Sequence, residues 1–400
     1  MKHFDSDADV INKYYRERKL KDAYFRTLDF VYSIFFDPPQ VSSQGQLGIP
    51  KRLLLVHGGH LGDTIVLMSL LPILRQAFPS TEIGLLTGSW NSPLLEGGEF
   101  DHVHYIDHWY ANRARISILS KIFRYAKALR RVVREVKKIK YDIAINLRPW
   151  LPNLVPIIWF AGISTRLGFD HSGFTPLLTH YLPFRYDRRT IRNYFTELLS
   201  SLSLERLPAE KLTVPWIQVE ARARADFGKI VGLGPSKPFA ILHMMGGSAV
   251  KNWREDGWRG IAERIVQRGM TPVFTGVGAD MHAAISRVTP SLEEYVNACD
   301  KLSIPQLAAA IEQATVVISV DTFIGHLAAA LGTPCVSIYG GMQDRKLWQP
   351  IGKRVQVVTH AVLCSPCFNN RGCAHMSCLQ NIEILDVDQA IDAVLQTSSQ

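Results

Sequence analysis

Short runs of aliphatic and β-branched residues alternate with longer amphipathic segments from Lys51 onward. A short apolar run is typical of a buried strand, and apolar positions that recur every three to four residues are typical of a helix. The elements predicted in the first half of the chain are strand 52–56, helix 63–77, strand 82–87, strand 102–106, helix 115–139 and strand 141–147. Pro72 predicts a kink in the first of these helices. Strands that alternate with helices indicate a parallel sheet covered by helices.

A second series of the same kind begins at PFAILHM (238–244). It continues with helix 256–268, strand 271–275, helix 303–313, strand 315–320, helix 325–331 and strand 334–339. The sequence therefore predicts an α/β protein with two Rossmann-like domains. Because ligands bind beyond the carboxyl ends of parallel strands, two such domains facing each other are expected to form the working site in the cleft between them.

Four segments follow from this pattern. Residues 1–50 form a polar N-terminal extension and linker, and residues 51–215 form the first domain. Residues 216–236 form an interdomain linker region, and residues 237–400 form the second domain. The final helical stretch, 387–394, is compatible with packing back onto the first domain, although nothing local requires it.

Composition and charge narrow the class of protein. The chain has 400 residues, 47% of them hydrophobic, and a net charge of +9. That charge indicates an anionic partner, and no zinc-finger spacing, aromatic RNA-binding pattern or basic zipper suggests nucleic acid. The longest apolar stretches are shorter than the roughly 20 residues that cross a bilayer, and the polar start MKHFDSDADV does not resemble a secretion signal. A cytoplasmic protein is therefore expected.

The stretch HGGHLGDTIVL (57–67) contains a glycine-rich turn between the first strand and its helix. A dinucleotide-binding turn has the pattern Gly-x-Gly-x-x-Gly, but here His57 takes the place of the first glycine. Asp63 stands in the first helical turn, where the helix dipole favours its charge and where it would repel a phosphate. Such a carboxylate suits a general base, and the alternative is that Asp63 only caps its helix.

The second half of the chain carries candidate anion-binding loops. In SVDTFIGHLAAAL (319–331), Asp321 and Thr322 stand at the expected helix start, where backbone amides attract phosphate. His326, one turn further on, can donate to a phosphate, although a lone histidine on an apolar helix is more often packed in the core.

A second loop, MGGSAVKNW (245–253), offers Gly246, Ser248 and Lys251. Exposed amides with a mobile cation can hold a diphosphate without a metal, and the alternative is a solvated surface loop. In the turn TGVGAD, Asp280 follows the next strand, where carboxylates bind ribose hydroxyls. Loops of this kind after neighbouring parallel strands favour a nucleotide site.

Together these segments resemble those of glycosyltransferase family 9, the lipopolysaccharide heptosyltransferases. The resemblance extends from about Lys51 to near the C-terminus. The matching segments are LGD (61–63), LPILRQAFP (71–79), TRLGF (165–169), GGSAVKNW (246–253), TGVGAD (275–280) and DTFIGHLAAALGTP (321–334).

The resemblance implies a GT-B fold and an inverting transfer of a sugar from a nucleotide donor, typically ADP-heptose, with no obligatory metal. It implies that Asp63 is the catalytic base and that the first domain binds a lipid-linked or oligosaccharide acceptor, with Gly62 and Arg166 on the acceptor side. It also implies that the second domain binds the nucleotide sugar. The donor-binding residues expected there are Gly246, Ser248, Lys251, Asp280, Asp321, Thr322, Gly325 and His326.

Two departures from the family pattern leave the donor open. Phe323 takes the place of the glycine in the usual Asp-Ser/Thr-Gly segment, and Asp280 replaces a longer glutamate. A GT-B transferase or epimerase that uses another nucleotide sugar is therefore an alternative. A noncatalytic nucleotide- or glycan-binding protein of the same pathway is a second.

The stretch 113–140 is strongly basic and contains a single acidic residue, Glu135. Its apolar positions, Leu129, Val132, Val136 and Ile139, are expected to face the sheet. Its outer face suits anionic lipid headgroups or acceptor phosphates, which would make the protein peripheral at the inner face of the inner membrane, and the alternative is a solvated crossover helix. The basic residues are Arg113, Arg115, Lys121, Arg124, Lys127, Arg130, Arg131, Arg134, Lys137, Lys138 and Lys140.

Four of the six cysteines lie close together in the sequence, as Cys364, Cys367, Cys373 and Cys378. The C-x2-C pair is typical of structural metal sites, but the later spacings are short for a zinc ribbon. A structural zinc or iron and ordinary thiols both remain open, and neither is expected to be catalytic.

Overall fold

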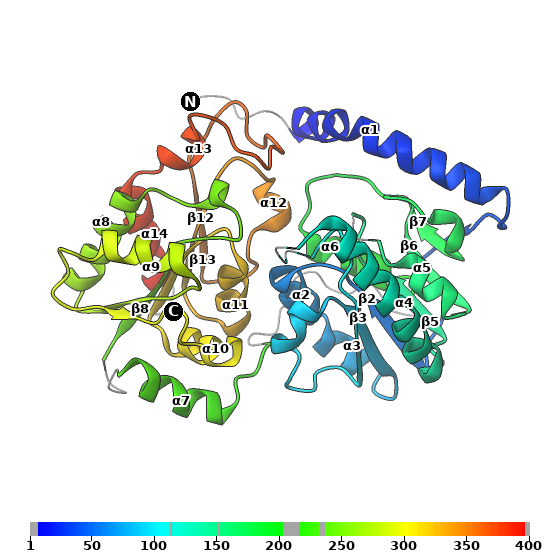
Figure 1. Ribbon diagram of the computed structural model, residues 1–400, viewed down its shortest axis with the longest axis horizontal. Coiled ribbons are helices and arrows are strands. Elements are labelled where there is room, and N and C mark those ends of the chain that lie inside the picture. Colours follow the sequence, from blue (N-terminus) through cyan, green and yellow to red (C-terminus); the bar gives the residue numbers. More distant parts are fainter. Residues whose placement is uncertain are drawn as a thin grey trace. The chain divides into compact units, whose positions relative to one another are not determined.

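The structure is a computed structural model that describes residues 7–112, 114, 116–150, 153–202, 216–232 and 237–396, without the side chains of residues 16 and 17. Two compact units form the chain (Figure 1): Ile11–Lys211, and Leu212–Gln400 together with Met1–Val10. Part of the expected linker region (233–236), as well as Arg113 and Arg115 of the basic stretch, lies outside the described residues.

A seven-stranded parallel sheet forms the centre of the first unit, in the order β1-β7-β6-β5-β2-β3-β4. From β2 the chain winds one way through β3 and β4, and it then returns to the other side of β2 for β5, β6 and β7. The strands are β1 (Gln40–Val41), β2 (Arg52–Val56), β3 (Glu82–Thr87), β4 (His102–Tyr105), β5 (Ile143–Asn146), β6 (Thr165–Phe169) and β7 (His180–Leu182).

The helices of this part of the chain follow the apolar periodicity. They are α1 (Asp7–Ser33), α2 (Leu61–Met68), α3 (Leu71–Ala77), α4 (Ile118–Ile139), α5 (Val155–Phe160) and α6 (Ile191–Leu199), with short 3-10 turns η1 (Ser89–Leu94) and η2 (Thr175–Leu177). The predicted helix 63–77 is interrupted, and Pro72 lies in the first turn of α3, where its missing N–H breaks no helical hydrogen bond.

The predicted apolar face of α4 is confirmed. Val132 and Val136 are fully buried beside Leu54 and Val56 of the sheet, with Leu129 and Ile139 partly buried against them. These contacts remove aliphatic side chains from water, and each Å² of apolar surface that is buried stabilises the fold by about 25 cal/mol.

A six-stranded parallel sheet forms the centre of the second unit, in the order β10-β9-β8-β11-β12-β13. Here the winding direction changes between β8 and β11. The strands are β8 (Phe239–His243), β9 (Thr271–Phe274), β10 (Val296–Asn297), β11 (Val316–Val320), β12 (Cys335–Tyr339) and β13 (Val355–Thr359).

The helices of the second unit alternate with these strands. They are α7 (Ala221–Val231), α8 (Glu255–Gln267), α9 (Ala279–Val288), α10 (Ile304–Gln313), α11 (Phe323–Leu331), α12 (Arg345–Trp348), α13 (Ser377–Gln380) and α14 (Ile384–Gln396), with η3 (Ala249–Lys251). The final helix, α14, packs on this second sheet, because Val387, Ile391 and Val394 are buried with Val336 and Ile338 of the same unit.

The two parallel sheets confirm the α/β class and the two Rossmann-like units. No helix in the described part of the chain is long and apolar enough to cross a membrane.

Candidate active site

In each sheet the strand order reverses once: successive strands are added toward one edge, and the chain then returns to add the remaining strands toward the other edge. At such a switch point the loops beyond the two carboxyl ends diverge and leave room for a ligand. In the first sheet this point lies between β2 and β5, and in the second it lies between β8 and β11. A partly buried ion pair lies at each of these two points, and we call the two groups of residues the first half-site and the second half-site.

The first half-site is built around Asp63. Its Oδ2 accepts a hydrogen bond from the backbone N–H of His60 at 3.0 Å, so this carboxylate does cap α2, as one alternative held. The same Oδ2 lies 3.0 Å from Nη1 of Arg148, which directly follows β5. Only 12% of the Asp63 side chain and 14% of the Arg148 side chain are exposed.

Gly59 allows these groups to approach one another. A Cβ at this position would lie 2.3 Å from Nε2 of His57, 2.5 Å from Oδ2 of Asp63 and 2.8 Å from Nη1 of Arg148. The Gly59 carbonyl is itself fixed, because it accepts hydrogen bonds from Trp90 Nε1 at 2.9 Å and from Asn91 Nδ2 at 3.1 Å. An imidazole, a carboxylate and a guanidinium therefore converge on one small volume beside a bare backbone.

The charges at this half-site are well defined. Burial raises the pKa of Asp63, but Arg148, His57 and the His60 N–H together outweigh it and hold that pKa below its usual value. Burial lowers the pKa of His57 to about 3, so its ring is neutral at physiological pH. The half-site thus holds an ionised carboxylate beside a guanidinium and a neutral imidazole.

The second half-site brings together two loops that the sequence singled out. Nζ of Lys251, at the end of η3, lies 2.7 Å from Oδ2 of Asp321, which follows β11. Thr322 is the N-cap of α11, and its hydroxyl accepts from the Ile324 N–H at 3.2 Å. A Cβ on Gly246 would lie 3.3 Å from Cβ of Lys251 and 3.4 Å from Cγ2 of Thr322. The lysine, its carboxylate partner and a helix N-terminus are therefore adjacent.

Other predicted donor residues have more structural surroundings. A Cβ on Gly325 would lie 2.5 Å from Oγ of Ser337 and 3.0 Å from Cγ of Pro350, so this glycine lets α11 pack closely on its sheet. His326 is 8% exposed and sits inside the same packed helix, which favours the core alternative. Ser248 is half-buried at the N-cap position of η3, where its side chain makes no capping hydrogen bond. The roles of these residues in donor binding stay predictions.

Asp280 and the acceptor-side residues lie apart from these clusters. Asp280 is exposed in the first turn of α9, beyond β9. Gly62 lies in the first turn of α2, next to Asp63. Arg166 lies near the start of β6, and its guanidinium donates to the carbonyls of Leu177 and Ile163. The structure does not bring Arg166 together with Asp63.

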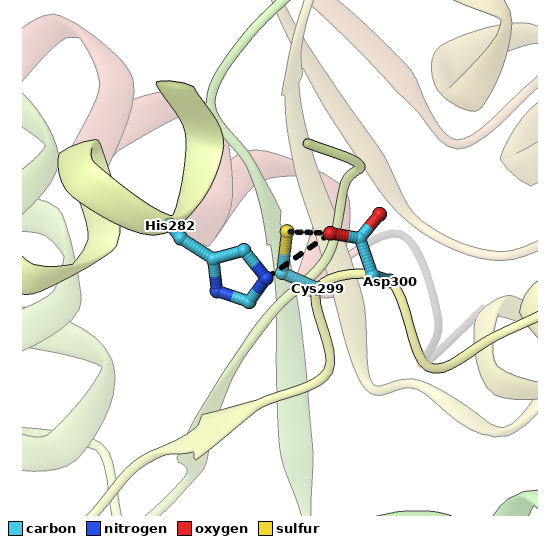
Figure 2. Close-up of side chains that lie close together, drawn as sticks. All are labelled: His282, Cys299 and Asp300. Carbon is cyan, nitrogen blue, oxygen red and sulfur yellow. Dashed lines mark hydrogen bonds and ion pairs between the residues drawn. The ribbon is translucent and has the colours of Figure 1, made fainter. Parts of the chain in front are cut away.

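Burial raises the pKa of the Cys378 thiol, and Cys364, Cys367 and Cys373 lie near enough to raise it further, but among the described residues no three of the four sulfur atoms lie within 4.8 Å of one another. Cys364 and Cys373 are exposed, whereas Cys367 and Cys378 are half-buried. Within the residues that the structure describes, the group whose ligand atoms lie within 4.8 Å of one another is instead His282, Cys299 and Asp300 (Figure 2). A structural metal at the cysteine cluster is therefore not supported.

Two residues of the half-sites were missed in the sequence. Arg148 directly follows the predicted strand 141–147 at the carboxyl edge, and that position was the available signal. Asn252 accepts the Gly246 N–H at 3.0 Å and so shapes the lysine loop, but a single asparagine in a loop gives no such signal.

Two Rossmann-like units, each with polar groups at its switch point and one with a lysine beside a helix N-terminus, define the class of GT-B nucleotide-sugar transferases and related enzymes. The family model described as "Glycosyltransferase family 9 (heptosyltransferase)" matches residues 129–376, which is more than half of the chain. The chain belongs to this family and is a glycosyltransferase.

Curated relatives cover most of the chain. Lipopolysaccharide heptosyltransferase 1 of Pseudomonas aeruginosa is 26% identical over 305 residues, which are 72% of this chain and 78% of the relative. Lipopolysaccharide heptosyltransferase 3 of Escherichia coli K12 is 24% identical over 297 residues, which are 72% of this chain and 82% of the relative.

Solved structures agree on the fold. A family 9 glycosyltransferase from Veillonella parvula has a TM-score of 0.73 at 21% identity and covers 90% of this chain and 100% of its own. The ADP-heptose lipopolysaccharide heptosyltransferase II of E. coli has a TM-score of 0.68 at 17% identity and covers 87% and 100%. An E. coli heptosyltransferase solved with ADP has a TM-score of 0.62 at 17% identity and covers 86% and 99%.

Proposed function

We propose that the protein is an inverting heptosyltransferase that moves heptose from ADP-heptose onto a lipopolysaccharide core or a related glycan acceptor. Family membership and the names of the relatives support the donor and the acceptor. The observation that carries the proposal is that one unit has a carboxylate held by an arginine at its switch point, while the other unit has a lysine beside a helix N-terminus at its own switch point.

Asp63 acts as the base in this proposal. Its Oδ2 accepts hydrogen bonds from the His60 N–H and from Arg148, and we assign Oδ1 to the acceptor hydroxyl. As the hydroxyl oxygen bonds to the anomeric carbon, its proton passes to Oδ1 and the bond from that carbon to the diphosphate oxygen breaks. Arg148 keeps the carboxylate ionised at neutral pH and fixes its direction.

The leaving ADP carries negative charge that the second half-site stabilises. Asp321 holds the Lys251 ammonium in place, and the amides in the first turn of α11 add the positive end of the helix dipole. Fixed positive groups of this kind stabilise a developing anion without a metal. We therefore propose a metal-independent reaction, with Asp280 contacting the ribose.

The test is transfer of heptose from ADP-heptose to a truncated core acceptor, followed by mass spectrometry. Asp63→Asn is expected to lower kcat by about 10² to 10⁴-fold, the range of general-base catalysis. Lys251→Ala is expected to lower it by about 10² to 10³-fold, and EDTA is expected to leave it unchanged. The control for Asp63→Asn is Glu135→Gln, which removes a carboxylate near the C-terminal end of α4.

Three outcomes would contradict parts of the proposal. If Asp63→Asn transferred heptose at the wild-type rate, Asp63 would not be the general base. Preference for UDP or GDP over ADP in competition would replace the donor. Tight nucleotide binding with no transfer from any nucleotide sugar would favour the noncatalytic binding protein.

We further propose that the cytoplasmic protein binds the membrane surface through the first two turns of α4. Four large apolar side chains are exposed there, in two i,i+4 pairs: Ile118 (52%), Leu119 (75%), Ile122 (43%) and Phe123 (71%). Lys121, Arg124 and Lys127 lie among them, and a cationic helix with exposed apolar side chains suits anionic lipid headgroups.

Sedimentation with lipid vesicles tests this surface. Wild-type protein is expected to sediment with phosphatidylglycerol vesicles and much less with phosphatidylcholine vesicles. Leu119→Asp with Phe123→Asp is expected to abolish sedimentation while ADP binding stays intact. Equal sedimentation of this double variant would show that another surface is responsible.

A further inference from the structure

The loop that leads from β9 to Asp280 is held by hydrogen bonds with Asp300, which follows the next strand, β10. The loop runs from Thr275 through two glycines at positive φ, Gly276 (152°) and Gly278 (90°), before α9 begins. Because glycine has no side chain and adopts many backbone conformations, contacts with neighbouring residues determine the path of the loop. Asp300, which follows β10, supplies those contacts.

Asp300 binds the loop on both sides. Its backbone N–H donates to the Gly276 carbonyl at 2.9 Å, and both of its carboxylate oxygens lie 3.0 Å from the Gly278 N–H. Asp300 itself has a positive φ of 59°, an uncommon conformation for a residue other than glycine. Strained backbone of this kind persists only where the surrounding contacts enforce it.

The carboxylate has a third partner. Nε2 of His282, one turn into α9, lies 3.1 Å from Oδ2 of Asp300, and the buried Cys299 sulfur lies 3.9 Å from the same oxygen (Figure 2). Asp300 therefore ties the loop to the first turn of the helix that starts with Ala279 and Asp280. The side chains of Asp300 and His282 are 47% and 45% exposed, so these bonds add little to the hydrophobic core.

We infer that Asp300 is a positioning residue for the nucleoside half of the donor. By binding Gly276 and Gly278, Asp300 fixes the path of the loop between β9 and α9. That path sets the position of Asp280, and therefore whether its carboxylate can contact a ribose hydroxyl. The diphosphate is held elsewhere, by the loop after β8 and the start of α11. This inference rests on the proposed function, since it assigns the loop after β9 to the donor nucleoside.

Calorimetric titration of the full-length protein with ADP and with inorganic pyrophosphate tests the inference. Loss of a hydrogen bond to a charged group corresponds to about a tenfold change or more in affinity. Asp300→Ala is therefore expected to raise the Kd for ADP about tenfold and to leave the Kd for pyrophosphate unchanged. Asp300→Asn keeps one acceptor for the Gly278 N–H and is expected to fall between wild type and Asp300→Ala. Lys251→Ala is expected to weaken the binding of both ADP and pyrophosphate.

The control is Glu82→Gln, which breaks another exposed carboxylate–histidine pair, 3.2 Å from His102 in the first unit, and is expected to change neither Kd. In transfer assays Asp300→Ala is expected to raise the donor KM with little change in kcat.

Several results separate the inference from its competitors. Equal weakening of ADP and pyrophosphate by Asp300→Ala would indicate general damage to the unit and overturn the positioning role. Unchanged ADP binding would also overturn it, while leaving the proposed function intact. Failure of wild type to bind ADP would instead end the proposed function and this inference with it. If EDTA weakened ADP binding by wild type but not by Asp300→Asn, the three side chains would belong to a metal ion and the inference would be wrong.

Discussion

Substitution of Gly59 by alanine tests the first half-site without removing any of its charged groups. The new Cβ would lie 2.3 Å from Nε2 of His57, 2.5 Å from Oδ2 of Asp63 and 2.8 Å from Nη1 of Arg148. All three distances are shorter than real Cβ contacts, so at least one side chain has to move. The hydrogen bonds from Trp90 and Asn91 to the Gly59 carbonyl prevent the backbone from moving instead.

The size of the effect follows from these distances. To relieve the contact with the new Cβ, the Asp63 carboxylate has to move by an amount approaching 1 Å. A misplacement of about 1 Å can lower the rate about 10²-fold. Overpacking of a buried site lowers the free energy of unfolding by about 1 to 3 kcal/mol. We therefore expect kcat for transfer to fall about 100-fold while the Kd for ADP, whose binding we propose for the second half-site, stays the same.

Steady-state transfer assays and thermal unfolding measure both effects in one preparation. Gly228→Ala is the matched control, because a Cβ at Gly228 in α7 meets nothing within 4 Å and alanine favours a helix. A Gly59→Ala protein that retains its kcat within about twofold would show that the crowding around Asp63 has no part in catalysis.

Three further predictions concern charge and packing. Arg148→Gln removes a group that lowers the pKa of Asp63, and since burial raises that pKa, the acid limb of kcat against pH is expected to move to higher pH; an unmoved limb would show that Asp63 is not the titrating base. Burial lowers the pKa of His243 to about 4, so the unfolded state binds the extra proton first, and the free energy of unfolding is expected to decrease by about 3 kcal/mol as pH falls from 6.5 to 4; His243→Gln should flatten that slope in denaturant titrations. Gly325→Ala is expected to lower the free energy of unfolding by about 1 to 3 kcal/mol through contact with Ser337, and an unchanged melting temperature would argue against close packing of α11.

Much of the fold was readable in the sequence because buried parallel strands are short apolar runs. Strands β2 and β3 begin and end at the predicted residues, and α11 begins two residues before the predicted start. The five-residue strands β6 and β13 were not predicted. Strands β1, β7 and β10 were not predicted either, since they are two or three residues long and exposed or half-buried. Sequence periodicity carries no signal for such short strands.

The candidate site was predictable only where a residue type and a strand end coincide. Asp63, Lys251 and Thr322 each follow a strand in a glycine-containing or polar segment, and the structure places all three at switch points. The ion pairs of Asp63 with Arg148 and of Lys251 with Asp321 join residues far apart in the chain, so local pattern could not reveal them.

The separate hydrophobic cores of the two units make the protein suited to reporting where a small molecule binds. A ligand stabilises directly only the folded region that it contacts, by an amount set by its concentration relative to its Kd. If each core melts as its own cooperative step, the proposed function predicts that nucleotide raises the melting temperature of one step and acceptor glycan that of the other. Heating a single sample would then identify donors and acceptors without any turnover.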